Sequence, residues 1–262
     1  MKYLYLLLCG ILGVIIFLQS ETWYLKHDTH KAAKAGALWI TTHQSEINDP
    51  GVVWILSEIN KDYCDDDKST KELIAKMFQP FRENPTKRAY ERLIDPNYSY
   101  VVATTSLKNG GGAFDDFLIP ALYCDVQQDL IPSTIGAAQD LAGGTRYQIT
   151  HAYLGLIWMK ERHCLTEKQT TYVDQLTPVI LYQQSQLKEF DDLYAENVAF
   201  LLYAHHEEFV SRDWIQTIIK SQEDSGGWKS PHDKYIFGSD ENTHTTALSL
   251  FALTQISKQC PF

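Results

Sequence analysis

Histidine and glutamate residues that could exchange protons with a ligand recur at the starts of apolar segments in the C-terminal half of the chain. They are His151, Glu196 and His244, spaced by roughly 45 to 50 residues, about one helical hairpin each. A histidine near a helix N-terminus is held neutral by the positive end of the helix dipole, which suits a base or a metal ligand. We therefore predict that these three residues are catalytic, with Glu196 as general acid or base and His151 as its partner.

The same residue types admit two other roles. Two histidines and one glutamate are the protein ligands of a three-coordinate catalytic zinc site, which would make the protein a metal-dependent hydrolase. The sequence has no H-E-x-x-H segment, so it assigns no metal ion and no cofactor. Alternatively, each side chain caps its own helix or bonds a neighbouring helix, and its role is structural.

Three further residues are predicted to contact a substrate. Asn197 follows Glu196, Asp115 lies with Asp116 just after the glycine-rich K-N-G-G-G segment, and Tyr235 belongs to the long return at residues 229–242. A solvated loop without function is the simpler alternative for Asp115 and Asp116.

Helices must position these residues, and the helical segments are of two kinds. The segments that follow Ser69 and Ser211 have one narrow apolar stripe, which is typical of a helix with one face in water. The segments 151–159, 193–204 and 245–256 are apolar nearly all round and must be buried on most sides. The alternation of buried and exposed helices predicts an all-α fold in which helical hairpins close into an α/α toroid, with a solenoid as the competitor.

The toroid predicts where the candidate residues lie. Its inner helices run roughly parallel, so residues near their starts gather at one mouth. We expect His151, Glu196 and His244 within roughly 15 Å of one another, because groups that act on one ligand must reach it together. The return at residues 229–242 should overhang the same mouth.

Helix starts and one irregular stretch complete the organisation. The predicted starts are the cap and first-turn proline at Asp49-Pro50, the cap at Ser211, and the capping boxes Ser69/Glu72 and Thr166/Gln169. Residues 95–146 include a β-branched run typical of one short strand, and the glycines at 110–112 do not suit a helix interior. We expect this stretch to be an irregular insertion or lid within a single domain at residues 21–262.

One local motif supports the toroid. The segment Q-E-D-S-G-G-W, from Gln222 to Trp228, resembles the Q-x-x-D-G-G-W box of α/α-toroid proteins such as triterpene cyclases, with Ser225 inserted. In those proteins the box is structural, since its glutamine closes the end of an outer helix and its tryptophan stacks beneath. The resemblance implies the fold but no cyclase activity, because the acidic catalytic motif of the cyclases is absent. Because Trp228 follows an outer helix of the predicted toroid, we expect it on the opposite or outer side of the barrel from the mouth.

A second resemblance covers more of the chain. The runs T-H-A-Y-L-G-L-I-W-M-K-E-R-H-C, D-L-Y-A-E-N-V-A-F-L-L-Y-A, R-D-W-I-Q-T-I-I-K-S-Q and N-T-H-T-T-A-L-S-L-F-A-L are similar in order and spacing to a family of uncharacterised secreted animal proteins known from thyroid. The N-terminal A-L-W-I-T-T-H-Q-S-E-I-N-D-P-G-V is also similar to that family's start. The resemblance implies secretion, a mainly helical fold and attention to His151, Glu196, Asn197 and His244. It implies no reaction, because the family has no established activity.

The N-terminus predicts export. Residues 3–18 carry no charge and follow Lys2, so residues 1–20 are expected to be a signal peptide or an uncleaved signal anchor. The next basic residue is Lys26, which favours a cytoplasmic N-terminus and an extracytoplasmic body, periplasmic or secreted. An oxidising compartment permits disulfide bonds, and we expect one or two structural bridges with the pairing left open. The cysteines available are Cys64, Cys124, Cys164 and Cys260.

The overall composition narrows the function. The formal net charge is −10 and no basic stripe is present, which argues against nucleic-acid binding. The 15 tyrosines and 6 tryptophans offer faces on which sugars can stack. We expect an exported enzyme that acts on a carbohydrate or cell-envelope polymer, with a glycan or small molecule as its ligand. A non-catalytic, membrane-tethered binding or scaffold protein is the main alternative, and membrane contact would come only through the N-terminal segment.

Overall fold

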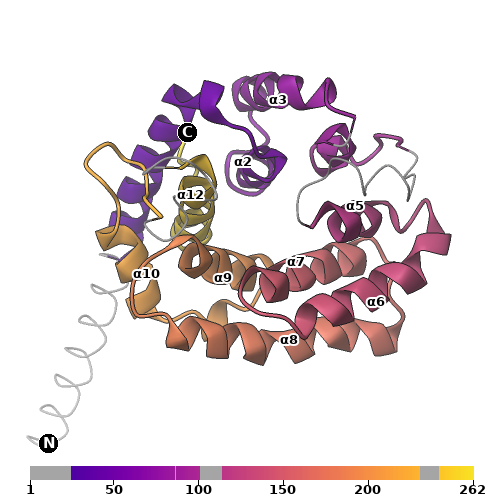
Figure 1. The fold of residues 1–262 in the computed structure, drawn as a ribbon. Coiled ribbons are helices and arrows are strands. Elements are labelled where there is room, and N and C mark those ends of the chain that lie inside the picture. Colours follow the sequence, from indigo (N-terminus) through magenta and orange to yellow (C-terminus); the bar gives the residue numbers. More distant parts are fainter. Residues whose placement is uncertain (1–24, 86, 101–113, 231–241) are drawn as a thin grey trace, which may run out of the picture.

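The computed structural model describes residues 25–85, 87–100, 114–230 and 242–262, and this part of the chain is helical (Figure 1). Within it the only β-type pairing is a single bridge between Gln222 and Trp228, so the predicted all-α class is confirmed. The α-helices are residues 25–42, α2 (Pro50–Tyr63), α3 (Lys68–Arg82), α5 (Asp115–Tyr123), α6 (Ile131–Ala142), α7 (Tyr147–Glu161), α8 (Glu167–Gln186), α9 (Asp192–Tyr203), α10 (Arg212–Lys220) and α12 (Thr243–Ser257). Short 3₁₀ helices are η1 (Gln44–Glu46), η2 (Lys87–Leu93), η3 (Gln128–Leu130) and η4 (Glu207–Phe209).

The helices form an inner and an outer set. In the inner set, α12 packs on α2 and α9, α9 packs on α7, and α7 packs on α5, while η2 contacts both α5 and α2. The outer helices lie against this set, with α3 on α2, α6 on α5 and α7, α8 on α7 and α9, and α10 on α12. Figure 1 shows α2, α12, α9, α7 and α5 around the centre of the molecule, with α3, α10, α8 and α6 outside them.

Burial follows the pattern of apolar residues in each helix. Every residue of α9 is buried, because its sequence has no polar face to turn toward water. In α10, by contrast, only Ile215 and Ile218 are buried. The predicted distinction between helices buried on most sides and helices with one wet face is therefore confirmed for these elements.

Most of the predicted helix starts are present as side-chain caps. They are Asp49 ahead of α2, the Thr166/Gln169 capping box ahead of α8, and Ser211 ahead of α10. The capping box predicted at Ser69 is wrong, because α3 begins at Lys68, two residues before the start at Thr70 that a Ser69 cap requires. The Asp67 carboxylate accepts from the Thr70 amide at 2.8 Å and so takes the cap position.

The stretch 95–146 is more regular than its composition suggested. It contains α5 and α6, so the description of the whole stretch as an irregular insertion is wrong. Seven of the nine α5 residues are buried, and their contact with α7 keeps the segment helical although Pro120 lies inside it. Residues 101–113, which hold the glycine run and most of the predicted strand, lie outside the described residues, so the lid stays a prediction.

Two disulfide bonds hold the ends of inner helices together. Cys64 follows α2 and pairs with Cys260, which lies beyond α12, and Cys124 follows α5 and pairs with Cys164, which lies beyond α7. The expected structural bridges are therefore confirmed, and both join C-terminal helix ends. Such bonds are compatible with an extracytoplasmic protein.

The predicted signal segment at residues 1–20 lies outside the described residues. Among the helices of the described ranges, none combines the length and the apolar character needed to cross a bilayer.

Candidate functional site

A cavity of about 510 Å³ opens among the N-terminal ends of the inner helices. Its polar lining includes Asp49 just ahead of α2, His151 in the first turns of α7, Asp192 and Glu196 on α9, and His244 at the start of α12. Aromatic side chains form much of the remaining wall. They are Trp54, Tyr90, Phe114, Tyr147, Trp158 and Phe200.

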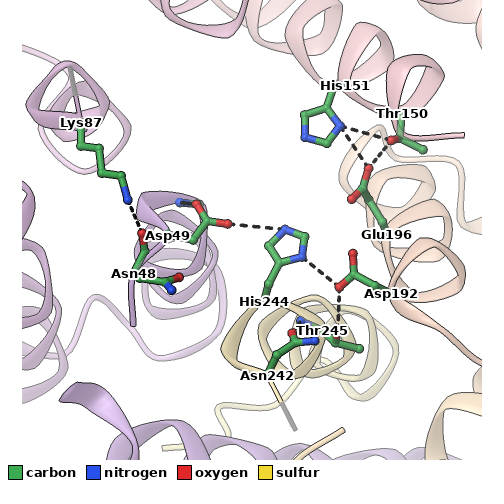
Figure 2. Close-up of polar contacts among 11 residues, drawn as sticks. Asn48, Asp49, Lys87, Thr150, His151, Asp192, Glu196, Asn242, His244 and Thr245 are labelled. Carbon is green, nitrogen blue, oxygen red and sulfur yellow. Dashed lines mark hydrogen bonds and ion pairs between the residues drawn. The ribbon is translucent and has the colours of Figure 1, made fainter. Parts of the chain in front are cut away.

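The three residues predicted to be catalytic meet at this cavity. His151 Nδ1 lies 3.4 Å from Glu196 Oε1. Glu196 and His244 each offer a ligand atom within 4.8 Å of the other. Figure 2 shows all three side chains directed into the same space. Their predicted convergence is confirmed, because the inner helices begin at one end of the molecule, while their catalytic role stays a prediction.

Glu196 and His151 are held by neighbours on α7. Glu196 is fully buried, and the Thr150 hydroxyl donates a hydrogen bond to its Oε1. The Nδ1 atom of His151 lies 2.8 Å from the Tyr147 carbonyl oxygen, and Phe114 stacks on the imidazole with ring centroids 3.9 Å apart. A carbonyl can only accept, so the Nδ1 atom carries the hydrogen in the neutral ring. The Nε2 atom is then the basic nitrogen.

His244 lies between two carboxylates. Its Nδ1 donates to Asp192 Oδ1 at 2.9 Å, and its Nε2 lies 3.6 Å from Asp49 Oδ2 (Figure 2). The Thr245 hydroxyl donates to the same Asp192 oxygen at 2.5 Å. Asp192 is fully buried, whereas 34% of the Asp49 side chain is exposed. Asp49 is therefore the carboxylate of this group that solvent reaches most readily.

Burial and charge separate the pKa values of these groups. Burial, with a smaller contribution from the nearby Asp192 carboxylate, raises the pKa of Glu196 to about 8. Burial lowers the pKa of His151 to about 4. For His244, burial acts in the lowering direction, but the Asp192 charge and hydrogen bond raise its pKa to about 10. For Asp192, burial acts in the raising direction, but the His244 charge and hydrogen bonds from His244 and Thr245 lower its pKa overall. At neutral pH this describes an Asp192–His244 ion pair beside an uncharged Glu196 and His151.

The residues predicted to bind substrate lie at different places in the structure. Asp115 lines the cavity and accepts a hydrogen bond from the Tyr90 hydroxyl at 2.5 Å, but it is the first residue of α5 and not part of a loop. Its neighbour Asp116 is exposed and does not line the cavity. Tyr235 lies outside the described residues and stays a prediction.

Asn197 does not lie at the cavity, which corrects the expectation that it contacts substrate. It is fully buried, where its side chain accepts from Gln183 at 2.9 Å and donates to Gln184 at 3.1 Å, both on α8. Successive residues of a helix point about 100° apart, so the neighbour of a cavity residue faces another helix.

The Q-E-D-S-G-G-W segment does not line the cavity, and its side chains make structural contacts. The Gln222 side chain donates to the carbonyl oxygens of Ala32 and Gly226, both at 2.8 Å. Trp228 is fully buried and its indole donates to the Ile218 carbonyl oxygen of α10 at 2.7 Å. Trp228 does not line the cavity, but its backbone amide donates to the Thr246 hydroxyl in the first turn of α12 at 3.0 Å, so its predicted place on the opposite or outer side stays a prediction.

Sequence reasoning missed Asp192 and treated Asp49 only as a cap. Asp192 precedes Glu196 by four residues, the spacing that puts two side chains on one face of a helix, and this D-x-x-x-E spacing in an otherwise apolar helix was the available signal. Lys87 and Tyr90 of η2 also line the cavity, but no pattern in the sequence connects them to the inner helices.

The arrangement can transfer protons to and from a ligand, because carboxylates and imidazoles of different protonation state meet at one surface. It can also hold a cation, because Asp192, Glu196 and His244 offer converging oxygen and nitrogen atoms. Comparison with protein-family models, curated proteins and solved structures finds no match to this chain.

Proposed function

We propose that this protein is an exported enzyme of α/α-toroid architecture that acts on a carbohydrate in the cavity. The inner set of helices covered by an outer set supports the architecture. The two disulfide bonds and the uncharged run at residues 3–18 support export, as does the resemblance to secreted animal proteins known from thyroid. A fold does not determine a reaction, so we infer the activity from the residues that line the cavity.

A single observation carries the proposal: acid–base side chains at the starts of four inner helices meet at a cavity that six aromatic side chains help to line. Aromatic faces such as those of Trp54 and Trp158 suit the apolar faces of sugar rings. Cleavage of a glycosidic bond requires groups that donate and accept protons beside the reacting carbons. A volume of about 510 Å³ falls in the range of sites that enclose a small ligand.

Exposure determines which groups a substrate would meet first. Glu196, the general acid or base predicted from the sequence, is fully buried, as is Asp192. Asp49 and His151 both retain exposed atoms at the cavity. We therefore assign proton transfer with the substrate to Asp49 and His151, and the placement of those groups to the buried residues behind them.

The test is a screen of the purified exported protein against a panel of oligosaccharides and cell-envelope polymers. Chromatography detects released products, and isothermal titration calorimetry on the same panel detects binding. The proposal expects at least one glycan that is both bound and cleaved. Binding without product would identify a carbohydrate-binding scaffold, and the absence of both would refute the carbohydrate assignment.

A further inference from the structure

We infer that Asp192, Glu196 and His244 bind one divalent transition-metal ion, and that Zn²⁺ is the ion their donor atoms suit best. The inference rests on the proposed function only in treating the cavity as a functional site, since metal binding can be measured without any substrate. It gives the two fully buried carboxylates a role that proton transfer with a substrate does not explain.

The spacing of the donor atoms fits a shared cation. One ligand atom from each of the three residues lies within 4.8 Å of the other two. Ligands bound to one cation at roughly 2.0 to 2.4 Å can be separated by at most about 4.8 Å. The three donor atoms therefore lie within the span that one cation allows.

Two buried carboxylate oxygens are directed into the site. Within the described residues, Asp192 Oδ2 and Glu196 Oε2 are buried and have no hydrogen-bond partner. Figure 2 shows these two oxygens facing each other, while the other oxygen of each carboxylate is already engaged. Buried carboxylate oxygens without a donor are costly, and two carboxylates in one site cannot both ionise without repulsion, in agreement with an uncharged Glu196 beside an ionised Asp192. A bound cation satisfies both oxygens and allows both carboxylates to ionise.

Neighbouring hydroxyl groups hold the carboxylates as they do in metal sites. Thr150 donates to Glu196 Oε1 and Thr245 donates to Asp192 Oδ1, which leaves the opposite oxygen of each carboxylate directed inward. Partners of this kind orient metal ligands, and their loss typically weakens metal binding about 10- to 100-fold.

The donor set selects the class of ion. One imidazole with two carboxylates is a mixed nitrogen and oxygen set, which suits zinc and related transition metals better than Mg²⁺ or Ca²⁺. All three ligands line the cavity, so a fourth coordination position faces the space where a substrate would bind. Three protein ligands with an open position are the pattern of a catalytic zinc site.

The experiment measures zinc binding by the exported protein, purified without a polyhistidine tag and stripped with a chelator. Equilibrium dialysis against ZnCl₂ with elemental analysis should give one Zn²⁺ per chain, with MgCl₂ and CaCl₂ as comparison salts. Asp192→Asn and Glu196→Gln should each weaken zinc binding at least about tenfold. His206→Ala is the matched control, because His206 pairs with Glu208 at 3.5 Å outside the cavity and could bind zinc adventitiously. This variant should bind zinc as the wild type does.

Further measurements distinguish a loss of zinc binding from a failure of a variant to fold. Circular dichroism reports folding, and Thr150→Val leaves all three ligands in place while removing the hydroxyl that holds Glu196, so it should weaken binding about 10- to 100-fold. The zinc X-ray absorption spectrum of the wild-type protein should show nitrogen and oxygen ligands only, since the assigned site contains no sulfur.

The outcomes separate the metal site from the proposed activity. The inference is overturned if the wild-type protein binds no zinc at micromolar concentrations, or if both folded ligand variants bind zinc as the wild type does. Loss of zinc in His206→Ala alone also overturns it. If the protein binds zinc as expected but cleaves no glycan, the proposed function is contradicted and the metal site is retained. If the protein cleaves a glycan but binds no zinc, the metal site is contradicted and the proposed function is retained.

Discussion

A buried carboxylate away from the cavity makes the stability of the protein depend on pH. Glu58 lies on α2, only 14% of its side chain is exposed, and it forms an ion pair with the exposed Lys61 at 3.6 Å. Burial raises the pKa of Glu58 from 4.5 to about 7, the Lys61 charge opposes this, and the Asp62 and Glu161 carboxylates add to it. Replacement by glutamine, which cannot ionise, isolates the effect.

The size and sign of the pH-dependent change in unfolding free energy follow from the pKa of Glu58 in the unfolded and folded protein. Between pH 4.5 and about 7 the folded protein holds a proton on Glu58 that the unfolded chain has already released. The stabilisation from this proton is complete below pH 4.5 and is lost as the pH rises through about 7. At about 1.4 kcal/mol for each pH unit between the two values, the loss amounts to about 3 kcal/mol. Glu58→Gln should therefore match the wild type at pH 4 and exceed its unfolding free energy by about 3 kcal/mol at pH 8.

Urea denaturation followed by far-ultraviolet circular dichroism at pH 4, 6 and 8 measures this difference. The control is Glu72→Gln on α3, whose side chain is exposed and pairs with the exposed Lys68, and which should show no comparable change. A difference between Glu58→Gln and the wild type that stays constant from pH 4 to pH 8 would refute the attribution to burial of the charge.

Two further predictions concern stability. Removing the bond between Cys64 and Cys260 with a double serine variant should lower the unfolding free energy by roughly 3 to 5 kcal/mol in denaturant titrations, because the bond closes a loop with a sequence separation of 196 residues; a loss below about 1 kcal/mol would contradict this. Gly155→Ala on α7 should lower the unfolding free energy by about 1 to 3 kcal/mol, because a β-carbon at this position overlaps the Phe117 ring. The control is Gly136→Ala on α6, where a β-carbon meets nothing within 4 Å and should raise the unfolding free energy by about 1 kcal/mol. Calorimetric unfolding of both variants gives the comparison, and equal shifts would contradict the packing of α5 on α7.

The sequence was most informative where residue pattern and helix direction act together. The segments of α7, α9 and α12 are apolar nearly all round, which predicts burial, and helices that begin at one end bring His151, Glu196 and His244 together. Because these segments are apolar nearly all round, the sequence does not show which face of each helix points toward the cavity. In a helix without a polar stripe, nothing in the sequence shows that Glu196 faces the cavity while Asn197 faces α8.

Other features depend on contacts between segments far apart in the chain. The α5 helix was missed because its glycine-rich approach and Pro120 suggest irregular structure, and only its packing on α7 explains why it is helical. The pairing of four cysteines is equally undetermined by spacing. The spacing of Asp192 and Glu196 indicates a shared helix face, but it does not predict that His244, from a helix distant in sequence, pairs with Asp192.

The most direct test of the central claim compares two aspartates that cap helices in the same way. Asp49 accepts from the Gly51 amide ahead of α2 at the cavity, and Asp67 accepts from the Thr70 amide ahead of α3, outside the cavity lining. Asparagine caps helices about as well as aspartate, so both Asp49→Asn and Asp67→Asn should fold.

The measurement is kcat/KM for each variant on a glycan that the wild-type protein cleaves. Loss of a group that transfers a proton in the reaction predicts a decrease of about 10²- to 10⁴-fold for Asp49→Asn and no change for Asp67→Asn. Equal activity of the two variants, with both folded, would contradict the assignment of the cavity as the active site.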